Sequence, residues 1–113
     1  MTFEMQHSAP GKWLDKIRED FSDLYQWAKD LNQRISMAED AEFAQEFDQY
    51  ETRLREIAMQ TREVFNKFGE MFRSDQVPTD IANEIEQKQL NPVYERIGEA
   101  YAKLEERKLQ IKQ

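Results

Sequence analysis

The stretch FAQEFDQYETRLREIAMQTREVFNKFGEM, residues 43 to 71, decides the fold. Its apolar residues recur in alternating steps of four and three, and one polar residue interrupts the series. A mean spacing of about 3.5 residues draws one nearly straight apolar seam along a helix, which is typical of a coiled coil or an extended helical bundle. The members of this seam are Phe43, Phe47, Tyr50, Leu54, Ile57, Thr61, Val64, Phe68 and Met71.

A second seam precedes it and has no polar interruption. We expect a first helix that begins at Pro10 and Gly11 and ends in a short turn near residues 37 to 40, where Asp40 can act as N-cap. The second helix then runs from about residue 41 to 73. The members of the earlier seam are Leu14, Ile17, Phe21, Leu24, Ala28, Leu31, Ile35 and Ala38.

The clearest break in the chain is the polar segment 74–80, which contains Pro78. Thr79 or Asp80 is expected to cap a third helix. Pro92 lacks a backbone donor and disfavours a helical conformation at Asn91. We therefore predict a kink there, or a split into helices 80–90 and 92–112 with Asn91 as the second cap. The seam expected in this segment comprises Leu90, Tyr94, Ile97, Tyr101, Leu104 and Ile111, broken by Lys108.

Three seams of similar length predict an all-α fold. They close most simply as an antiparallel up-down-up three-helix bundle in a single domain, residues 10–113, after a flexible N-terminus, residues 1–9. The alternative is a long helical hairpin that dimerises, with the third segment folded back or swapped between chains. In either case Thr61 and Lys108 are polar interruptions that either specify the register or reach solvent.

Composition narrows the possible partners. The chain of 113 residues carries a net charge of −7, which argues against a phosphate-binding surface and hence against nucleic acid. It has no apolar run long enough to span a membrane and no basic, then apolar, signal segment, so a cytoplasmic location is expected. The absence of cysteine excludes disulfides and thiolate metal sites.

No residue pattern indicates catalysis, a cofactor or a metal site. His7 is the single histidine and lies in the unpatterned N-terminus. A di-metal bundle site needs a Glu-x-x-His arrangement together with further inward carboxylates, and the seams carry no acid. An all-helical enzyme of the chorismate-mutase kind would need basic side chains inside the seam, and the inward positions are instead apolar. We therefore expect a non-enzymatic protein with no cofactor.

Aromatic residues that border the seams are the candidate protein-interaction residues. Such residues either widen the core, which is the commoner case, or mark a partner surface. Phe65 and Phe72 can face either the third helix or a second chain, and Met59 lies opposite its seam. The candidates are Trp13, Tyr25, Trp27, Met59, Phe65 and Phe72.

Residues 13 to 112 resemble one spectrin-type repeat, the rod unit of spectrin, alpha-actinin, dystrophin, plakins and nesprins. Leu24-Tyr25-Gln26-Trp27 is similar to the family's Leu-x-x-Trp motif, although Trp27 lies one residue before the seam position of Ala28. Tyr94, four residues after Leu90, stands where the family usually has tryptophan. Pro92 also departs from the family's continuous helix.

The resemblance implies a structural or scaffolding module that spaces domains and binds protein partners, either as a monomer within a rod or as a homodimer. The alternative is a free-standing small bacterial or phage helical protein, acting as a secretion-type chaperone or as an acidic inhibitor that imitates nucleic acid. Mimicry needs carboxylates aligned at phosphate-like spacing. The acids are instead interspersed with lysine and arginine, which counts against the inhibitor but not against the chaperone.

Overall fold

The computed structural model describes the backbone of residues 2–75 and 77–112, and the side chains of 12–75 and 77–111. Within these ranges the chain is helical apart from its connections, and no strand is present, so the expected all-α fold is confirmed. None of the described helices is both long enough and apolar enough to cross a membrane. In chain order the elements are α1 (Thr2–Met37), α2 (Asp40–Arg73), α3 (Thr79–Ile85), a π-helical turn η1 (Glu86–Leu90) and α4 (Asn91–Lys112).

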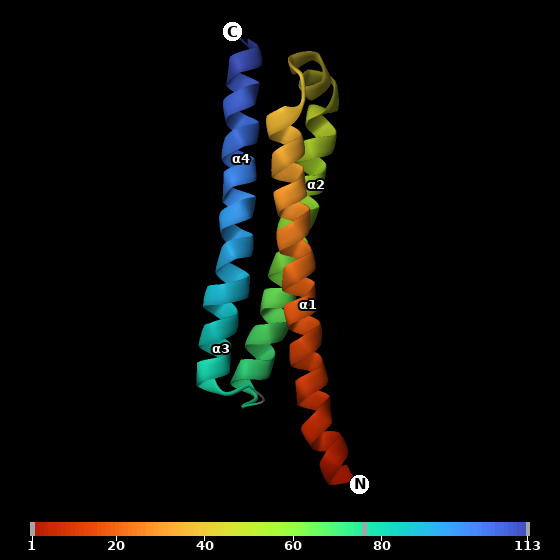
Figure 1. Cartoon of the computed structure of the whole chain (residues 1–113), viewed down its shortest axis with the longest axis vertical. Helices are drawn as coiled ribbons and strands as arrows, with labels where there is room; N and C mark the ends of the chain where they lie inside the picture. The colour runs from red at the N-terminus through yellow and green to blue at the C-terminus, as the bar shows by residue number, and fades with distance from the viewer. Residues whose placement is uncertain (1, 76, 113) are drawn as a thin grey trace.

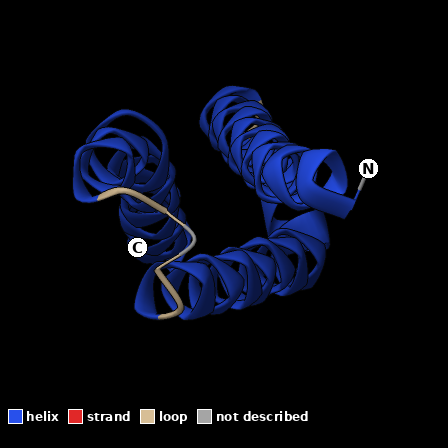
Figure 2. Ribbon diagram, turned by 90° about the horizontal axis from the view of Figure 1, so that it is seen from below, coloured by secondary structure: helices blue, strands red, loops and turns tan. Residues whose placement is uncertain are grey.

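The helices form an elongated rod whose Cα atoms extend over 64 × 22 × 18 Å. The short turn after α1 lies at one end of the rod and the loop after α2 lies at the other (Figure 1). Seen from below, the helical segments surround a common centre and do not lie in one plane (Figure 2). α1 packs extensively against both α2 and α4, whereas the contact between α2 and α4 is smaller.

The predicted seams of α1 and α2 supply most of the buried core, and the third segment supplies the rest. On α2, seven of the eight apolar seam positions are buried, and the eighth, Phe47, is partly buried against them. On α1, the seam positions from Ile17 to Ile35 are buried, and Leu14 and Ala38 at the two ends of the seam are partly buried. Burying one such side chain stabilises the fold by about 1.5–3 kcal/mol, whereas an exposed ion pair such as Glu51 with Arg55 contributes roughly 0.3–0.5 kcal/mol. The seams therefore dominate the stability.

Thr61 is fully buried and does not reach solvent. Its hydroxyl donates a hydrogen bond of 2.7 Å to the carbonyl of Ile57, one turn earlier in the same helix. A buried hydroxyl is tolerated when it is hydrogen-bonded, so this polar residue interrupts the seam without leaving an unpaired group.

The seam predicted for the third segment is wrong at alternate positions. Leu90, Ile97 and Leu104 are buried as expected, but Tyr94, Tyr101 and Ile111 are 44%, 36% and 37% exposed. Smaller residues take the inward positions, because a helix side that faces two neighbouring helices leaves little room for a tyrosine ring. Lys108 is also displaced from the core. The residues buried in their place are Val93, Ala100 and Arg107.

The chain remains helical through Asn91 and Pro92, so Asn91 is not a cap. Asn91 has helical dihedral angles, φ −58° and ψ −42°, and the departure from α-helical geometry is the π-turn just before it. Proline cannot donate to the carbonyl four residues earlier and its ring clashes with that group, which a wider turn relieves. The π-turn also spaces Ile85 and Leu90 five residues apart, where a regular seam has four.

Three expected helix starts differ from the structure. α1 begins at Thr2 and not at Pro10, because a single proline removes only one helical hydrogen bond and residues 2–9 contain no other helix breaker. The N-caps of α2 and α3 are Glu39 and Pro78, neither with a side-chain capping bond. Main-chain bonds begin these helices, from Phe43 N–H to Glu39 at 2.8 Å and from Ala82 N–H to Pro78 at 2.9 Å. The flexibility expected of residues 1–9 stays a prediction.

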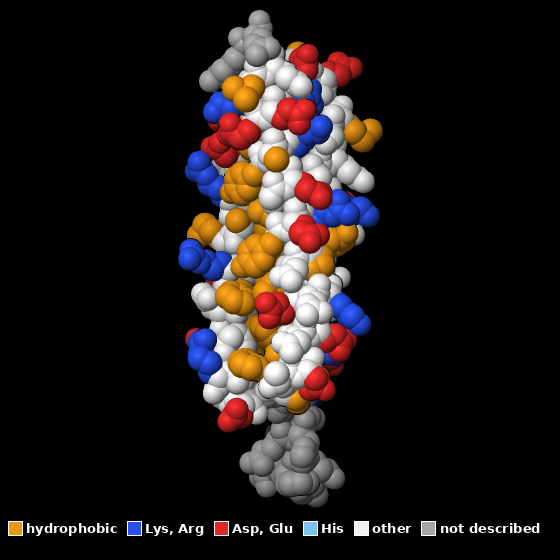
Figure 3. Space-filling model, turned by 90° about the vertical axis from the view of Figure 1, so that its left-hand side faces the viewer, with side chains coloured by type: hydrophobic (Ala, Val, Ile, Leu, Met, Phe, Trp, Pro, Cys, Tyr) orange, Lys and Arg blue, Asp and Glu red, His pale blue; other side chains and the backbone are white. Residues whose placement is uncertain are grey.

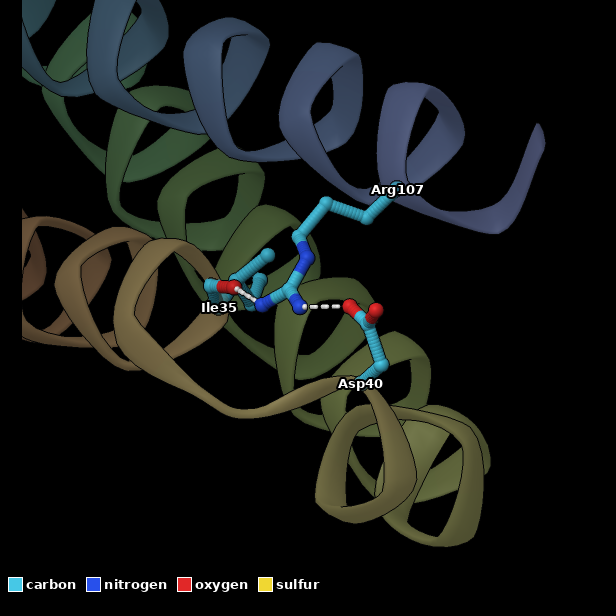
Figure 4. A network of polar contacts seen from close by, with 3 residues as sticks. All are labelled: Ile35, Asp40 and Arg107. Atoms are coloured by element: carbon cyan, nitrogen blue, oxygen red, sulfur yellow. Dashed lines mark hydrogen bonds and ion pairs between the residues drawn. The ribbon is translucent and has the colours of Figure 1, made fainter. Parts of the chain in front are cut away.

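Arg107 joins three helices at one end of the rod (Figure 4). Its guanidinium, in a residue that is 9% exposed, donates to the Ile35 carbonyl in the last turn of α1 at 2.6 Å and to the Asp40 carboxylate at the start of α2 at 2.9 Å. It also lies 4.7 Å from the centre of the Phe43 ring. Carbonyls in the last turn of a helix lack helical partners and carry its negative pole, so a cation there satisfies them.

Removing this cation should destabilise the fold. We expect Arg107→Ala to lower the free energy of unfolding by about 2–4 kcal/mol, because it leaves the Ile35 carbonyl unpaired and removes buried methylenes. The free energy of unfolding of Arg107→Lys should lie between those of Arg107→Ala and the wild type, because lysine lacks the planar guanidinium that donates to both partners. Asp40→Asn should cost less than about 1 kcal/mol, because the Asp40 side chain is 86% exposed. Urea unfolding checks this order, and an Asp40 effect as large as the Arg107 effect would contradict it.

The π-turn can be tested by changing the chain length. Deleting Lys88 removes the extra residue and forces Pro92 into a regular helix, which should cost about 3 kcal/mol. Adding Pro92→Ala to the deletion should restore most of that stability, because the seam then has regular spacing on both sides. Pro92→Ala alone should change little. Thermal unfolding followed by circular dichroism measures all three, and a deletion tolerated with Pro92 in place would refute the account.

Candidate protein-interaction surfaces

The described residues contain no cluster of chemically reactive or metal-ligating side chains. Between residues 12–75 and 77–111, no group of three or more histidine, cysteine, aspartate or glutamate residues is placed to hold a metal ion. The side chain of His7 lies outside the described residues. The hollows in the surface are open grooves between neighbouring helices. The candidates that the structure can place are the protein-interaction residues expected from the sequence.

The groove between α1 and α2 brings together two of the predicted residues. Trp13 and Trp27 lie fourteen residues apart on α1, which places them on the same side of that helix, and both face α2. A hollow of about 500 Å³ lies beside Trp13, with Ile17 and Met71 on its floor and Lys67 on its rim. Trp13 is 59% exposed, so this end of the groove offers an open indole.

Trp27 is more enclosed than Trp13. The guanidinium of Arg53 on α2 lies 5.2 Å from the centre of its ring, a cation–π contact across the groove. The residue is 39% exposed. Trp27 therefore helps to join α1 to α2, while Trp13 remains the more accessible of the pair.

Tyr25 lies on the opposite side of α1 and faces α4. Arg96 of α4 covers its ring at 5.5 Å, and a groove of about 300 Å³ between the helices is lined by Tyr25, Gln89 and Pro92. The side-chain oxygen of Gln89 is buried there without a hydrogen-bond partner among the described residues. Tyr25 is partly buried against the core, which fits a residue that widens it.

Phe65 and Phe72 project from the side of α2 that faces α4. Lys67 and Glu70 line the groove with α1, so they mark one side of the α2 seam. Phe65 and Phe72 follow the buried Val64 and Met71 by one residue and so emerge on the other side. Each is 41% exposed.

Two tyrosines lie on the side of α4 that faces α2. The ammonium of Lys108 lies 5.2 Å from the ring of Phe47, which shows the side of α4 that faces α2. Tyr101 and Tyr94 precede Lys108 by seven and fourteen residues and therefore share that side. We call the set Phe65, Phe72, Tyr94 and Tyr101 the α2–α4 aromatic strip. From the side of α3 and α4, hydrophobic side chains form a column along the rod, between charged margins (Figure 3).

Sequence reasoning found half of this strip. Phe65 and Phe72 were recognised because they border a complete seam, but Tyr94 and Tyr101 were assigned to the core. A preference for small residues at inward positions would have exchanged them for Val93 and Ala100. Met59 is 64% exposed on the side of α2 opposite its seam, apart from the other candidates.

Comparison with protein families, with curated proteins and with solved structures finds no match to this chain. The fold and the surfaces define an all-helical rod with aromatic side chains along its grooves.

One buried titratable group lies near the turn between α1 and α2. The hydroxyl of Tyr50 donates to the Glu46 carboxylate at 3.0 Å. Burial of the ring, and then this carboxylate, raise the pKa of Tyr50 above its ordinary value of 10.0. The neutral phenol is therefore the form that the fold favours.

This shift makes Tyr50 a source of alkaline instability. A phenol whose pKa is raised by folding contributes stability that is complete below about pH 10 and is lost as pH rises through the folded pKa, since the unfolded state ionises first. We expect Tyr50→Phe to cost about 0.5–1.5 kcal/mol at pH 8. Between pH 9 and 11 the variant should lose stability less steeply than the wild type. Urea unfolding across this range is the measurement, and parallel pH profiles would show that Tyr50 has no such role.

Proposed function

We propose that this chain is a non-enzymatic helical module that spaces other domains and binds protein partners through its sides. In this proposal the helices form an antiparallel up-down-up three-helix bundle of the spectrin-repeat kind, acting in the cytoplasm. The observation that carries the proposal is the placement of the two ends of the rod. The start of α1 and the end of α4 lie at opposite ends of the long axis (Figure 1). Anything joined to them is held apart by the length of the rod.

The composition of the core supports a structural role more than a chemical one. Among the side chains that the structure describes, the buried positions of all three helical segments are apolar except for Thr61, which bonds its own helix, and Arg107, which bonds two helix ends. Neither group is left free to act on a ligand. The accessible features are instead aromatic side chains at the helix borders, of the type that protein interfaces favour.

A secretion-type chaperone is the second candidate function. The α2–α4 aromatic strip favours it, because a chaperone of this kind holds an amphipathic segment against an exposed apolar surface. The acidic-inhibitor alternative has no comparable support. Basic side chains lie among the acids, with Arg53 beside Glu56 at 3.3 Å and Arg96 beside Glu99 at 3.1 Å.

The spacer proposal can be tested by measuring distances within one chain. The protein has no cysteine, so Lys12→Cys with Gln110→Cys gives a clean pair of labels near opposite ends. Time-resolved energy transfer between dyes should report one narrow, long distance that does not change when unlabelled protein is added in excess. Lys12→Cys with Ser74→Cys is the matched control and should report a short distance, because Trp13 and Ser74 line the same groove.

A broad distribution for the pair 12 and 110, like that of a flexible linker, would contradict the spacer role. A distance as short as that of the control pair would contradict it as well. A distance that changes with unlabelled protein would favour the swapped hairpin.

A further inference from the structure

The groove between α1 and α2 contains two adjoining hollows. The hollow of about 500 Å³ beside Trp13 is followed by one of about 250 Å³ beside Trp27, and Asp20 and Lys67 line both of them. Trp13 is also the most exposed aromatic residue among the side chains that the structure describes, at 59%. The buried apolar residues that line the two hollows are Ile17, Leu24, Val64 and Met71.

The charge along this groove is mainly negative. Its two hollows, together with a third near the turn between α1 and α2, are lined by six acidic and three basic side chains. Apart from Asp20, which pairs with Lys16 at 3.0 Å, none of these acids forms an ion pair with another described residue. Most of this negative charge is therefore not neutralised within the described chain. The acids are Asp20, Asp23, Asp30, Glu42, Glu63 and Glu70, and the bases are Lys16, Arg34 and Lys67.

The groove on the other side of α1 has the opposite charge. Lys88 is the one charged residue that lines the hollow between α1 and α4, and Arg96 lies over the Tyr25 ring on the same side. A basic partner is therefore attracted to the α1–α2 side of α1 and repelled from the α1–α4 side.

Trp27 shows how the α1–α2 groove holds a cation. The guanidinium of Arg53 lies 5.2 Å from the centre of its ring, an arrangement that an aromatic face favours. Trp13 lies two heptads earlier on the same side of α1. Among the described residues, no lysine or arginine covers the Trp13 ring as Arg53 covers Trp27. The face of Trp13 can therefore take a cation from another molecule.

We propose that the α1–α2 groove docks a basic amphipathic helix of a partner protein, with a lysine or arginine of that helix over the Trp13 ring. The inference rests on the proposed function and names the class of one partner. Two neighbouring helices leave a groove into which a third helix packs its apolar side. The fourteen residues from Trp13 to Trp27 correspond to about 21 Å, so about four turns of the partner helix cover the groove.

The groove offers a second place for a cation of the partner. Asp23 on α1 and Glu63 on α2 line the hollow beside Trp27 from its two sides. Asp23 is ten residues from Trp13, or about 15 Å along the helix. Two basic residues about eleven apart lie on one side of a helix and span about the same distance. The partner helix is therefore expected to carry basic residues three turns apart beside its apolar side.

Net charge favours a basic partner over a second copy of this chain. Each copy carries a net charge of −7, so two copies repel each other. A basic helix instead neutralises the carboxylates of the groove, and its association is steered by the same charge.

The first test uses the fluorescence of the groove itself, because both tryptophans of the chain lie in it. The probe is a synthetic helix of about 18 residues, with leucine on one side, arginine along both borders of that side and no aromatic residue. Added to Trp27→Phe protein, in which Trp13 is the one remaining indole, it should shift the emission to shorter wavelength and reduce quenching by acrylamide. Binding should saturate at one peptide per chain and weaken as salt is raised.

The second test compares matched variants by isothermal titration calorimetry with the same peptide. Trp13→Ala should raise the dissociation constant by at least about tenfold, whereas Met59→Ala, an exposed apolar residue away from the groove, should leave it unchanged. Glu63→Lys should weaken binding and reduce its salt dependence. Glu95→Lys makes the same change in net charge at an exposed acid of α4, outside the groove, and should have a much smaller effect.

Failure of the peptide to bind saturably, or equal weakening by Glu63→Lys and Glu95→Lys, would overturn the proposal. Binding that is lost in Tyr94→Glu but not in Trp13→Ala would overturn it in favour of the chaperone candidate, with the peptide on the α2–α4 aromatic strip. A mass that rises with concentration in the wild type but not in Trp13→Ala would make a second copy the occupant, which also overturns it. The distance between residues 12 and 110 is measured without peptide, so the groove can fail while the spacer role stands.

Discussion

The guanidinium of Arg107 is held between two helix ends at the turn that joins α1 to α2. The last turn of α1 presents unpaired carbonyls, and the first turn of α2 presents Asp40 to the same space. The planar guanidinium of Arg107 on α4 donates a hydrogen bond to each of them, and the ring of Phe43 packs against its face. Because this contact ties the third helical segment to the connection between the first two, it fixes how far α4 is shifted along the rod. The pairing of core residues further along depends on that shift.

The carbonyl is the more important partner. The Asp40 carboxylate is largely in water, where an ion pair is screened and contributes little, whereas the Ile35 carbonyl has no water to replace the guanidinium. The same distinction explains why Thr61 is accommodated in the α2 seam. In both cases a buried polar group is paired with a backbone carbonyl, so the apolar core continues past it.

Much of α1 and α2 could be predicted because large apolar residues repeat there at regular spacing, and because polar residues typical of turns follow each helix. The buried residues of the third segment could not be predicted in this way, for a physical reason. Val93 and Ala100 compete with Tyr94 and Tyr101 for the same seam, and only the space between neighbouring helices decides in favour of the smaller residues. Arg107 was missed because an amphipathic pattern treats every arginine as exposed. Half of the aromatic strip could not be recognised for the first of these reasons, because the four-three spacing assigns Tyr94 and Tyr101 to the core.

The π-turn from Glu86 to Leu90 adds one residue to the helix and so interrupts the heptad spacing of the third segment. Elsewhere an added or lost residue rotates every later side chain by about 100°, which turns the core outward unless whole heptads change together. At this turn a single residue is already absorbed, and the seams before and after it keep facing inward. The third segment can therefore lose one residue at this turn only if Pro92 is replaced as well, whereas a change of length in either of the first two helices has to be a whole heptad.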